Sequence, residues 1–104
     1  MFDSMAIHKT GIRDYAGEMT RDLEQMIADL EPAAEGGDPQ AQYELFTLYH
    51  DLARRRLSWS CFDRAEALLR STAQAGLPAA AQRLADVDAL RYAFTRCVER
   101  STAA

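Results

Sequence analysis

The fold is decided by one stretch of the chain, which reads Ala33-Ala34-Glu35-Gly36-Gly37-Asp38-Pro39-Gln40-Ala41-Gln42-Tyr43-Glu44-Leu45. Glycine readily adopts the left-handed conformation that ends helices, so Gly36 or Gly37 is a candidate C-terminal cap. Asp38 can accept a hydrogen bond from a free N–H of the next helix, and Pro39 suits the first helical position because it has no N–H. Stop and start signals therefore lie side by side, which predicts two helices that turn sharply against each other.

The same pattern returns later in the chain at a constant offset of 39 residues, from 37 to 76 and from 39 to 78. The residue pairs at this offset are Gly37 and Gly76, Pro39 and Pro78, Ala41 and Ala80, and Leu45 and Leu84. A fixed offset between about 20 and 50 residues is typical of stacked helical repeats. The second copy has Leu77 in the place of Asp38, so we expect the second turn to depend more on packing than on side-chain capping.

Composition indicates a small helical domain. The chain has 104 residues, the size of a single domain spanning 1–104, and 48% of them are hydrophobic and 27% charged. Valine is rare and alanine is abundant, a balance that favours helix over sheet. We therefore expect an all-α fold.

Charge and hydropathy narrow the environment in which the protein works. The formal net charge of −4 gives no general attraction to nucleic acid or to an anionic membrane. No apolar run approaches the roughly 18–20 residues that span a bilayer, and no signal peptide is visible at the N-terminus. Cys61 and Cys97 show no metal-binding spacing, so we expect reduced thiols in a cytoplasmic protein, with no cofactor and no metal.

Apolar spacing and helix signals divide the chain into segments. Residues 1–11 are expected to be flexible or to dock on the core, and residues 12–36 to form an N-terminal helical region. Two helices are predicted over 38–57 and 61–75. A single long helix is predicted over 78–100, where its second half covers the open end of the stack.

Side-chain patterns within these segments predict the core and one helix cap. The apolar face of the first helical region consists of Ile12, Tyr15, Met19, Leu23, Met26, Ile27 and Leu30. Leu45 and Leu68 are the expected core leucines of the two following helices. Ser60 and Asp63 fit a capping box, in which each side chain satisfies the other's free backbone N–H.

The repeated residues resemble the Sel1-like repeat family, which is similar to tetratricopeptide repeats. The matching positions around the first turn are Ala33, Ala34, Gly37, Asp38, Ala41, Leu45 and Tyr49. Those in the second helix of the repeat are Asp63, Ala65, Leu68, Leu69, Ala73 and Gly76. The best-matching repeat spans 38–76. The resemblance implies a short stack of antiparallel helix pairs, about five helices, that binds another protein.

The chain departs from the family pattern in two places. A stretch over 50–57 that looks helical replaces the glycine-containing loop between the two helices of the repeat, so we expect the first helix to be extended. Asp88 stands where the first unit has Tyr49, which makes the second repeat over 78–100 degenerate.

The expected function is that of a non-enzymatic protein–protein interaction module in a bacterium, acting as an adaptor, a secretion chaperone or an immunity protein. The candidate partner-binding residues lie between the apolar faces of the predicted helices. They are Glu44, Thr47, Asp51, Arg55, Arg83, Asp86 and Leu90. The sequence leaves self-association open, because Phe2, Trp59 or Phe94 could form a homodimer if exposed.

Nucleic-acid binding is the alternative function, because Arg54, Arg55 and Arg56 could contact phosphates while the nearby Trp59 stacks on a base. Helical spacing splays three consecutive arginines around the helix axis, so nucleic acid is the less favoured partner. Enzyme signatures are missing: the chain has no phosphate-binding glycine loop, no HExxH pair and no nucleophile elbow. Cys61 near a helix start is expected to be a buried or half-buried thiol rather than a reactive one.

Overall fold

The computed structural model describes the backbone of residues 2–103 and the side chains of residues 17–102. Its described backbone is helical apart from short turns, which confirms the predicted all-α class. The helices are α1 (Phe2–Glu35), α2 (Pro39–Arg56), α3 (Trp59–Gln74), α4 (Pro78–Ala85) and α5 (Val87–Ala103). The expected number of about five helices is therefore confirmed for this part of the chain.

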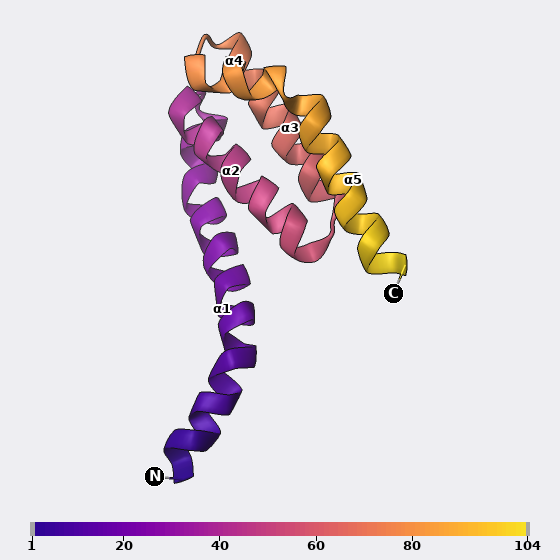
Figure 1. Cartoon of the computed structure of the whole chain (residues 1–104). Helices are drawn as coiled ribbons and strands as arrows, with labels where there is room; N and C mark the ends of the chain where they lie inside the picture. The colour runs from indigo at the N-terminus through magenta and orange to yellow at the C-terminus, as the bar shows by residue number, and fades with distance from the viewer. Residues whose placement is uncertain (1, 104) are drawn as a thin grey trace.

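The helices pack as antiparallel neighbours in chain order (Figure 1). α2 lies against both α1 and α3, and α4 packs against α3. After α4 the chain turns, and α5 runs back along α3, where the rings of Phe94 and Phe62 stack with centroids 4.8 Å apart. This return of α5 makes α2 and α5 the two walls of one surface groove.

The two glycine turns share one geometry, as their sequences predict. Gly37 has a φ of 95° and Gly76 a φ of 92°, so both occupy the left-handed region. In each turn the glycine N–H donates to a carbonyl three residues earlier, and the next N–H donates to a carbonyl five residues earlier. These bonds satisfy carbonyls that the helix end leaves free. Asp38 caps α2 by accepting from the Gln40 N–H at 3.0 Å, whereas Leu77 makes no capping bond and is half-buried against the core.

A third left-handed turn lies between α2 and α3, where no glycine marks it. Leu57 has a φ of 52°, and the Ser58 N–H donates to the Ala53 carbonyl at 3.0 Å. Ser58 then caps α3, because its Oγ accepts from the Cys61 N–H at 3.2 Å. The predicted capping box at Ser60 is therefore wrong: α3 begins at Trp59, and the cap lies two residues earlier in the chain.

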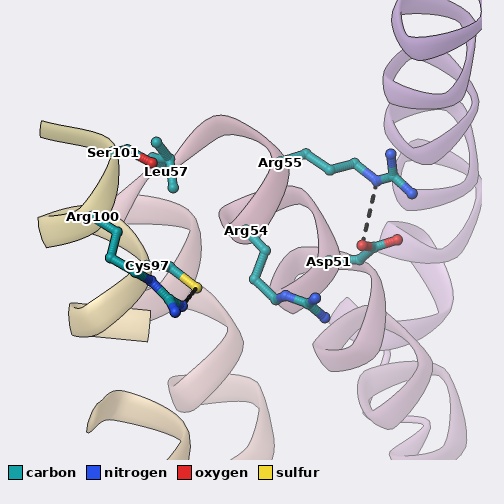
Figure 2. A pocket seen from close by; sticks show the side chains of 7 residues that line it. All are labelled: Asp51, Arg54, Arg55, Leu57, Cys97, Arg100 and Ser101. Carbon is teal, nitrogen blue, oxygen red and sulfur yellow. Dashed lines mark hydrogen bonds and ion pairs between the residues drawn. The ribbon is translucent and has the colours of Figure 1, made fainter. Parts of the chain in front are cut away.

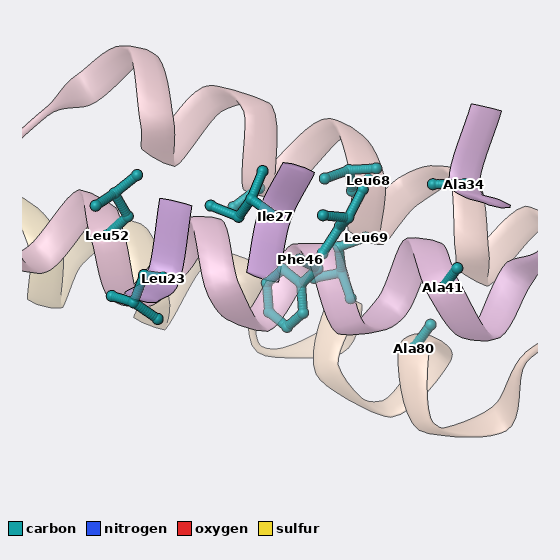
Figure 3. Packing of buried hydrophobic residues seen from close by; sticks show 11 residues of the cluster. Leu23, Ile27, Ala34, Ala41, Phe46, Leu52, Leu68, Leu69 and Ala80 are labelled. Carbon is teal, nitrogen blue, oxygen red and sulfur yellow. The ribbon is translucent and has the colours of Figure 1, made fainter. Parts of the chain in front are cut away.

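The core has two parts. The larger cluster joins the first four helices (Figure 3) and consists of Leu23, Ile27, Ala34, Ala41, Leu45, Phe46, Leu52, Ala65, Leu68, Leu69 and Ala80. The smaller cluster joins α2, α3 and α5 through Ala53, Phe62 and Phe94. Ala41 and Ala80, which share the sequence offset, are 4% and 0% exposed, so both turns bring a small side chain close to a neighbouring helix.

The structure corrects predicted helix boundaries and the predicted burial of one side chain. α1 begins at Phe2 rather than at residue 12, and the side chains that were expected to dock within residues 1–11 lie outside the described ones. The predicted helix over 78–100 is divided at Asp86, which ends α4 with a φ of −100° and a ψ of 10°. Met26 was predicted to face the core, but its side chain is 50% exposed, whereas Leu23 and Ile27 of the same helix are buried.

The left-handed backbone at Leu57 predicts a stabilising substitution. A residue with a Cβ in this conformation costs roughly 1–2 kcal/mol, which glycine avoids. The greater freedom of glycine in the unfolded chain offsets part of that gain. We expect Leu57→Gly to raise the free energy of unfolding by about 0.5–1 kcal/mol in urea titrations. Leu57→Ala is the control and should bring no gain; equal stabilisation by both variants would contradict the backbone explanation.

The buried leucines predict large losses of stability. Leu45 is 0% exposed and Leu68 is 5% exposed. Truncation of either side chain leaves a cavity, so Leu45→Ala and Leu68→Ala should each lower the free energy of unfolding by about 2–5 kcal/mol. Met26→Ala provides a control on the exposed face and should stay within about 0.5 kcal/mol of the wild type. Melting of the two leucine variants at the wild-type temperature would contradict the packing.

Candidate functional site

A groove runs between the C-terminal half of α2 and the helices α4 and α5. It consists of two cavities, of about 490 and about 310 Å³, which share Arg54 and Cys97. We call it the α2–α5 groove, and its lining residues are His50, Asp51, Arg54, Arg55, Leu57, Arg83, Leu90, Ala93, Phe94, Cys97, Arg100 and Ser101. Figure 2 shows the larger cavity, with the Asp51–Arg55 ion pair of α2 on one side and the contact between Arg100 and Cys97 of α5 on the other.

The groove collects arginines that have no acidic partner. Within the described side chains, Arg54, Arg83 and Arg100 form no ion pair with a carboxylate, although Arg100 contacts the Cys97 sulfur at 3.7 Å. Most other described arginines do pair, including Arg64 with Glu31. The acidic chain therefore carries a locally positive groove.

Apolar and aromatic side chains form the floor between these charges. Phe94 is 2% exposed and Leu90 is half-buried. His50 lies between two rings, with centroid distances of 5.9 Å to Phe46 and 5.8 Å to Phe62. The groove can therefore receive a segment that combines negative charge with an apolar side chain.

The position of His50 sets its charge. Burial lowers the pKa of the imidazole below its usual value of 6.5, and the positive charges of Arg54 and Arg83 lower it further. Asp51 acts in the opposite direction but more weakly. Because the pKa is depressed, His50 is neutral at neutral pH and adds an uncharged aromatic surface to the groove.

The structure brings some of the predicted partner-binding residues together. Arg83 and Leu90 line the smaller cavity, and Asp51 and Arg55 line the larger one, where they form an ion pair at 3.3 Å. The remaining three candidates, Glu44, Thr47 and Asp86, are exposed but line neither cavity.

The arginine cluster does not present a single face. Arg54 turns into the groove, Arg55 pairs with Asp51 on its own helix, and Arg56 reaches Glu24 of α1 at 2.8 Å. Helical spacing predicted this divergence. Trp59 is 37% exposed and packs edge-on to Phe94 at 4.6 Å. Phe94 was named as a contact for self-association, but it is buried and contributes no such surface, and the Phe2 side chain lies outside the described ones.

One arginine of α5 adds polar contacts with α3 to the packing of Phe94 against Phe62. Arg91 contacts both Glu66 and Asp63 of α3 and lies over the rings of Trp59 and Phe62. Although burial opposes it, hydrogen bonds from Arg91 and Arg70 lower the pKa of the Glu66 carboxyl. These contacts fix the wall of the groove from its outer side.

Sequence reasoning missed several groove residues. His50, Phe94, Cys97 and Arg100 were not among the candidates, although they line the groove. A signal for α5 exists in its spacing, since Leu90, Phe94 and Cys97 recur at intervals of three and four. Cys61 is half-buried at the third residue of α3, as expected.

The depressed pKa of His50 predicts a pH-dependent stability. In the unfolded chain the imidazole titrates near 6.5, so the fold favours the neutral form and loses stability as the pH falls through that value. Between about pH 7.5 and about pH 5.5, wild-type protein should lose more free energy of unfolding than His50→Gln. This window lies above the usual pKa of glutamate, which separates the effect from that of Glu66. Equal losses in the two proteins would contradict the assignment to His50.

Neither family models, curated proteins nor solved structures yield a match to this chain. Within the described residues, no helix combines the length and the hydropathy needed to cross a membrane.

Proposed function

We propose that the protein is a non-enzymatic interaction module, related to Sel1-like repeats, that binds another protein through the α2–α5 groove. The observation that carries this proposal is the convergence of Arg54, Arg83 and Arg100, which have no carboxylate partner among the described side chains, on a groove with an apolar floor. Unpaired charge beside apolar surface is typical of a surface that a partner completes.

The helical stack supports this proposal. Stacked helix pairs present a groove lined by side chains from successive pairs, and here α2 supplies one wall while α4 and α5 supply the other. The shared left-handed geometry of Gly37 and Gly76 supports the resemblance. We also propose that the protein is cytoplasmic and acts as an adaptor, a secretion chaperone or an immunity protein.

Nucleic-acid binding is supported less well. A track for phosphates needs several cations along one face and exposed rings for the bases. Arg55 and Arg56 are engaged by Asp51 and Glu24, which leaves Arg54 as the one residue of the cluster with no described carboxylate partner. Phe94 lines the groove, but its side chain is only 2% exposed. Its ring therefore offers no face on which a base could stack.

Affinity capture from cells of the source organism tests the proposed function. Tagged wild-type protein should retain a specific protein, and Arg54→Glu/Arg83→Glu should retain at least about tenfold less of it, since tenfold corresponds to about 1.4 kcal/mol. Arg21→Glu is the matched control, because Arg21 is exposed on α1 and forms no ion pair with a described carboxylate. Circular dichroism should show the same helicity in all variants.

Two results would overturn the proposed function. Wild-type protein that retains nothing above a tag-only control would remove the evidence for a protein partner. Equal retention by the wild type and Arg54→Glu/Arg83→Glu would place the binding surface outside the α2–α5 groove.

A further inference from the structure

We propose that the α2–α5 groove binds an acidic segment of the partner, with carboxylates on Arg54, Arg83 and Arg100 and an apolar side chain over Leu90. The inference rests on the proposed function and adds the chemistry of the occupant. Three features support it: the charges of the groove, its apolar floor and the position of His50.

The net charge of the groove is opposite in sign to that of the whole chain. The chain has a formal net charge of −4, yet the described arginines in the lining outnumber its acidic residues. Among the described residues, Asp51 is the one carboxylate that lines either cavity, and it pairs with Arg55 at 3.3 Å. Arg54, Arg83 and Arg100 are left without carboxylates. Complementary charge is therefore negative, and arginine forks match carboxylates well.

The floor of the groove favours a peptide over a bare anion. The smaller cavity is lined by Leu90, Ala93 and Phe94 as well as by arginines. A free carboxylate or phosphate would leave this apolar surface in water, whereas an acidic segment with one aliphatic side chain covers both kinds of surface. Arg54 lines both cavities, so a segment that runs from one to the other passes beside it.

The protonation of His50 should respond to a ligand in the groove, because the charges of Arg54 and Arg83 act on its imidazole. The charged groups around it are Asp51 and Arg54 on its own helix and Arg83 on α4, while α3 presents the Phe62 ring and α5 the Cys97 thiol. Burial is the main cause that disfavours the imidazolium, and carboxylates placed on Arg54 and Arg83 would offset the positive charges that add to it. Binding would then take up a proton, and an acidic segment would bind more tightly as the pH falls towards about 5.5.

Fluorescence anisotropy with defined peptides tests the inference on the full chain. The probes are a labelled acidic peptide that contains one leucine, the same peptide with glutamine for each acid, and the same peptide with lysine for each acid. The acidic peptide should bind the wild type at least about tenfold more tightly than the glutamine peptide, and added salt should weaken it. The double variant Arg54→Glu/Arg83→Glu should bind the acidic peptide with about tenfold lower affinity than the wild type, and the lysine peptide with higher affinity. Arg21→Glu should match the wild type.

A second readout uses pH. The affinity for the acidic peptide should rise between about pH 7.5 and about pH 5.5 in wild-type protein and stay flat in His50→Gln, provided that circular dichroism shows both to be folded. Identical slopes in the two proteins would place the peptide away from His50 and overturn the assignment to the groove.

The remaining outcomes separate this inference from the proposed function. If the acidic peptide does not bind, or if the glutamine peptide binds equally well, the inference of an acidic segment is overturned. Capture of a cellular protein can still succeed in that case, so the proposed function is tested separately. Single-stranded RNA of the same charge that binds more tightly than the acidic peptide, and is lost in Arg54→Glu/Arg83→Glu, would overturn it in favour of a nucleic acid.

Discussion

The structure depends on left-handed backbone at the ends of three of its helices. Gly37, Leu57 and Gly76 each reverse the chain within a few residues, and the N–H groups that follow bind carbonyls of the helix just completed. Such turns leave no loop in which neighbouring helices could drift apart. Gln42 strengthens the first turn, since its side chain donates to the Ala34 carbonyl and accepts from the Ser71 hydroxyl. The order of helices in the stack follows from these turns.

The distribution of ion pairs gives the molecule two different sides. On the side of α1 the acids engage arginines, as Glu24 does with Arg56 and Glu31 with Arg64, and Tyr49 joins Glu31 at 3.3 Å. On the opposite side of α2, the described groove offers its arginines only Asp51, which Arg55 already occupies. An acidic protein can therefore present a basic groove, because Asp51 is the one described carboxylate that lines it. Net charge, which argued against an anionic partner, averages over these two sides.

Local signals predicted the turns and the central pair of helices. The glycines at 37 and 76 and the prolines that follow them specify their own geometry, and Leu45 and Leu68 lie on faces that two neighbouring helices cover. These features need only short stretches of sequence. The same logic identified Leu77 as a poor cap, because an aliphatic side chain has no acceptor.

The remaining features depend on contacts between distant residues. No glycine or proline marks the break at Asp86, which arises where α5 turns so that Phe94 reaches Phe62. The cap of α3 moved from Ser60 to Ser58 because α2 ends at a left-handed leucine, which no local preference favours. The groove itself exists only because α5 folds back on α3. The sequence pattern therefore identified Arg83 and Leu90, and Arg54 as part of the arginine cluster, but it did not identify His50, which lines the same cavity.

The packing in chain order also bears on how the protein folds. Each of the main helix contacts joins neighbours in sequence, and the turns between them contain only a few residues. Bringing together segments so close in the chain costs little loop entropy, and proteins dominated by local contacts fold in microseconds to milliseconds. The pair α2 and α3, joined at Leu57 and Ser58, can form first and offer α1 and α4 a surface on which to assemble. The short turns between the helices therefore also favour rapid folding.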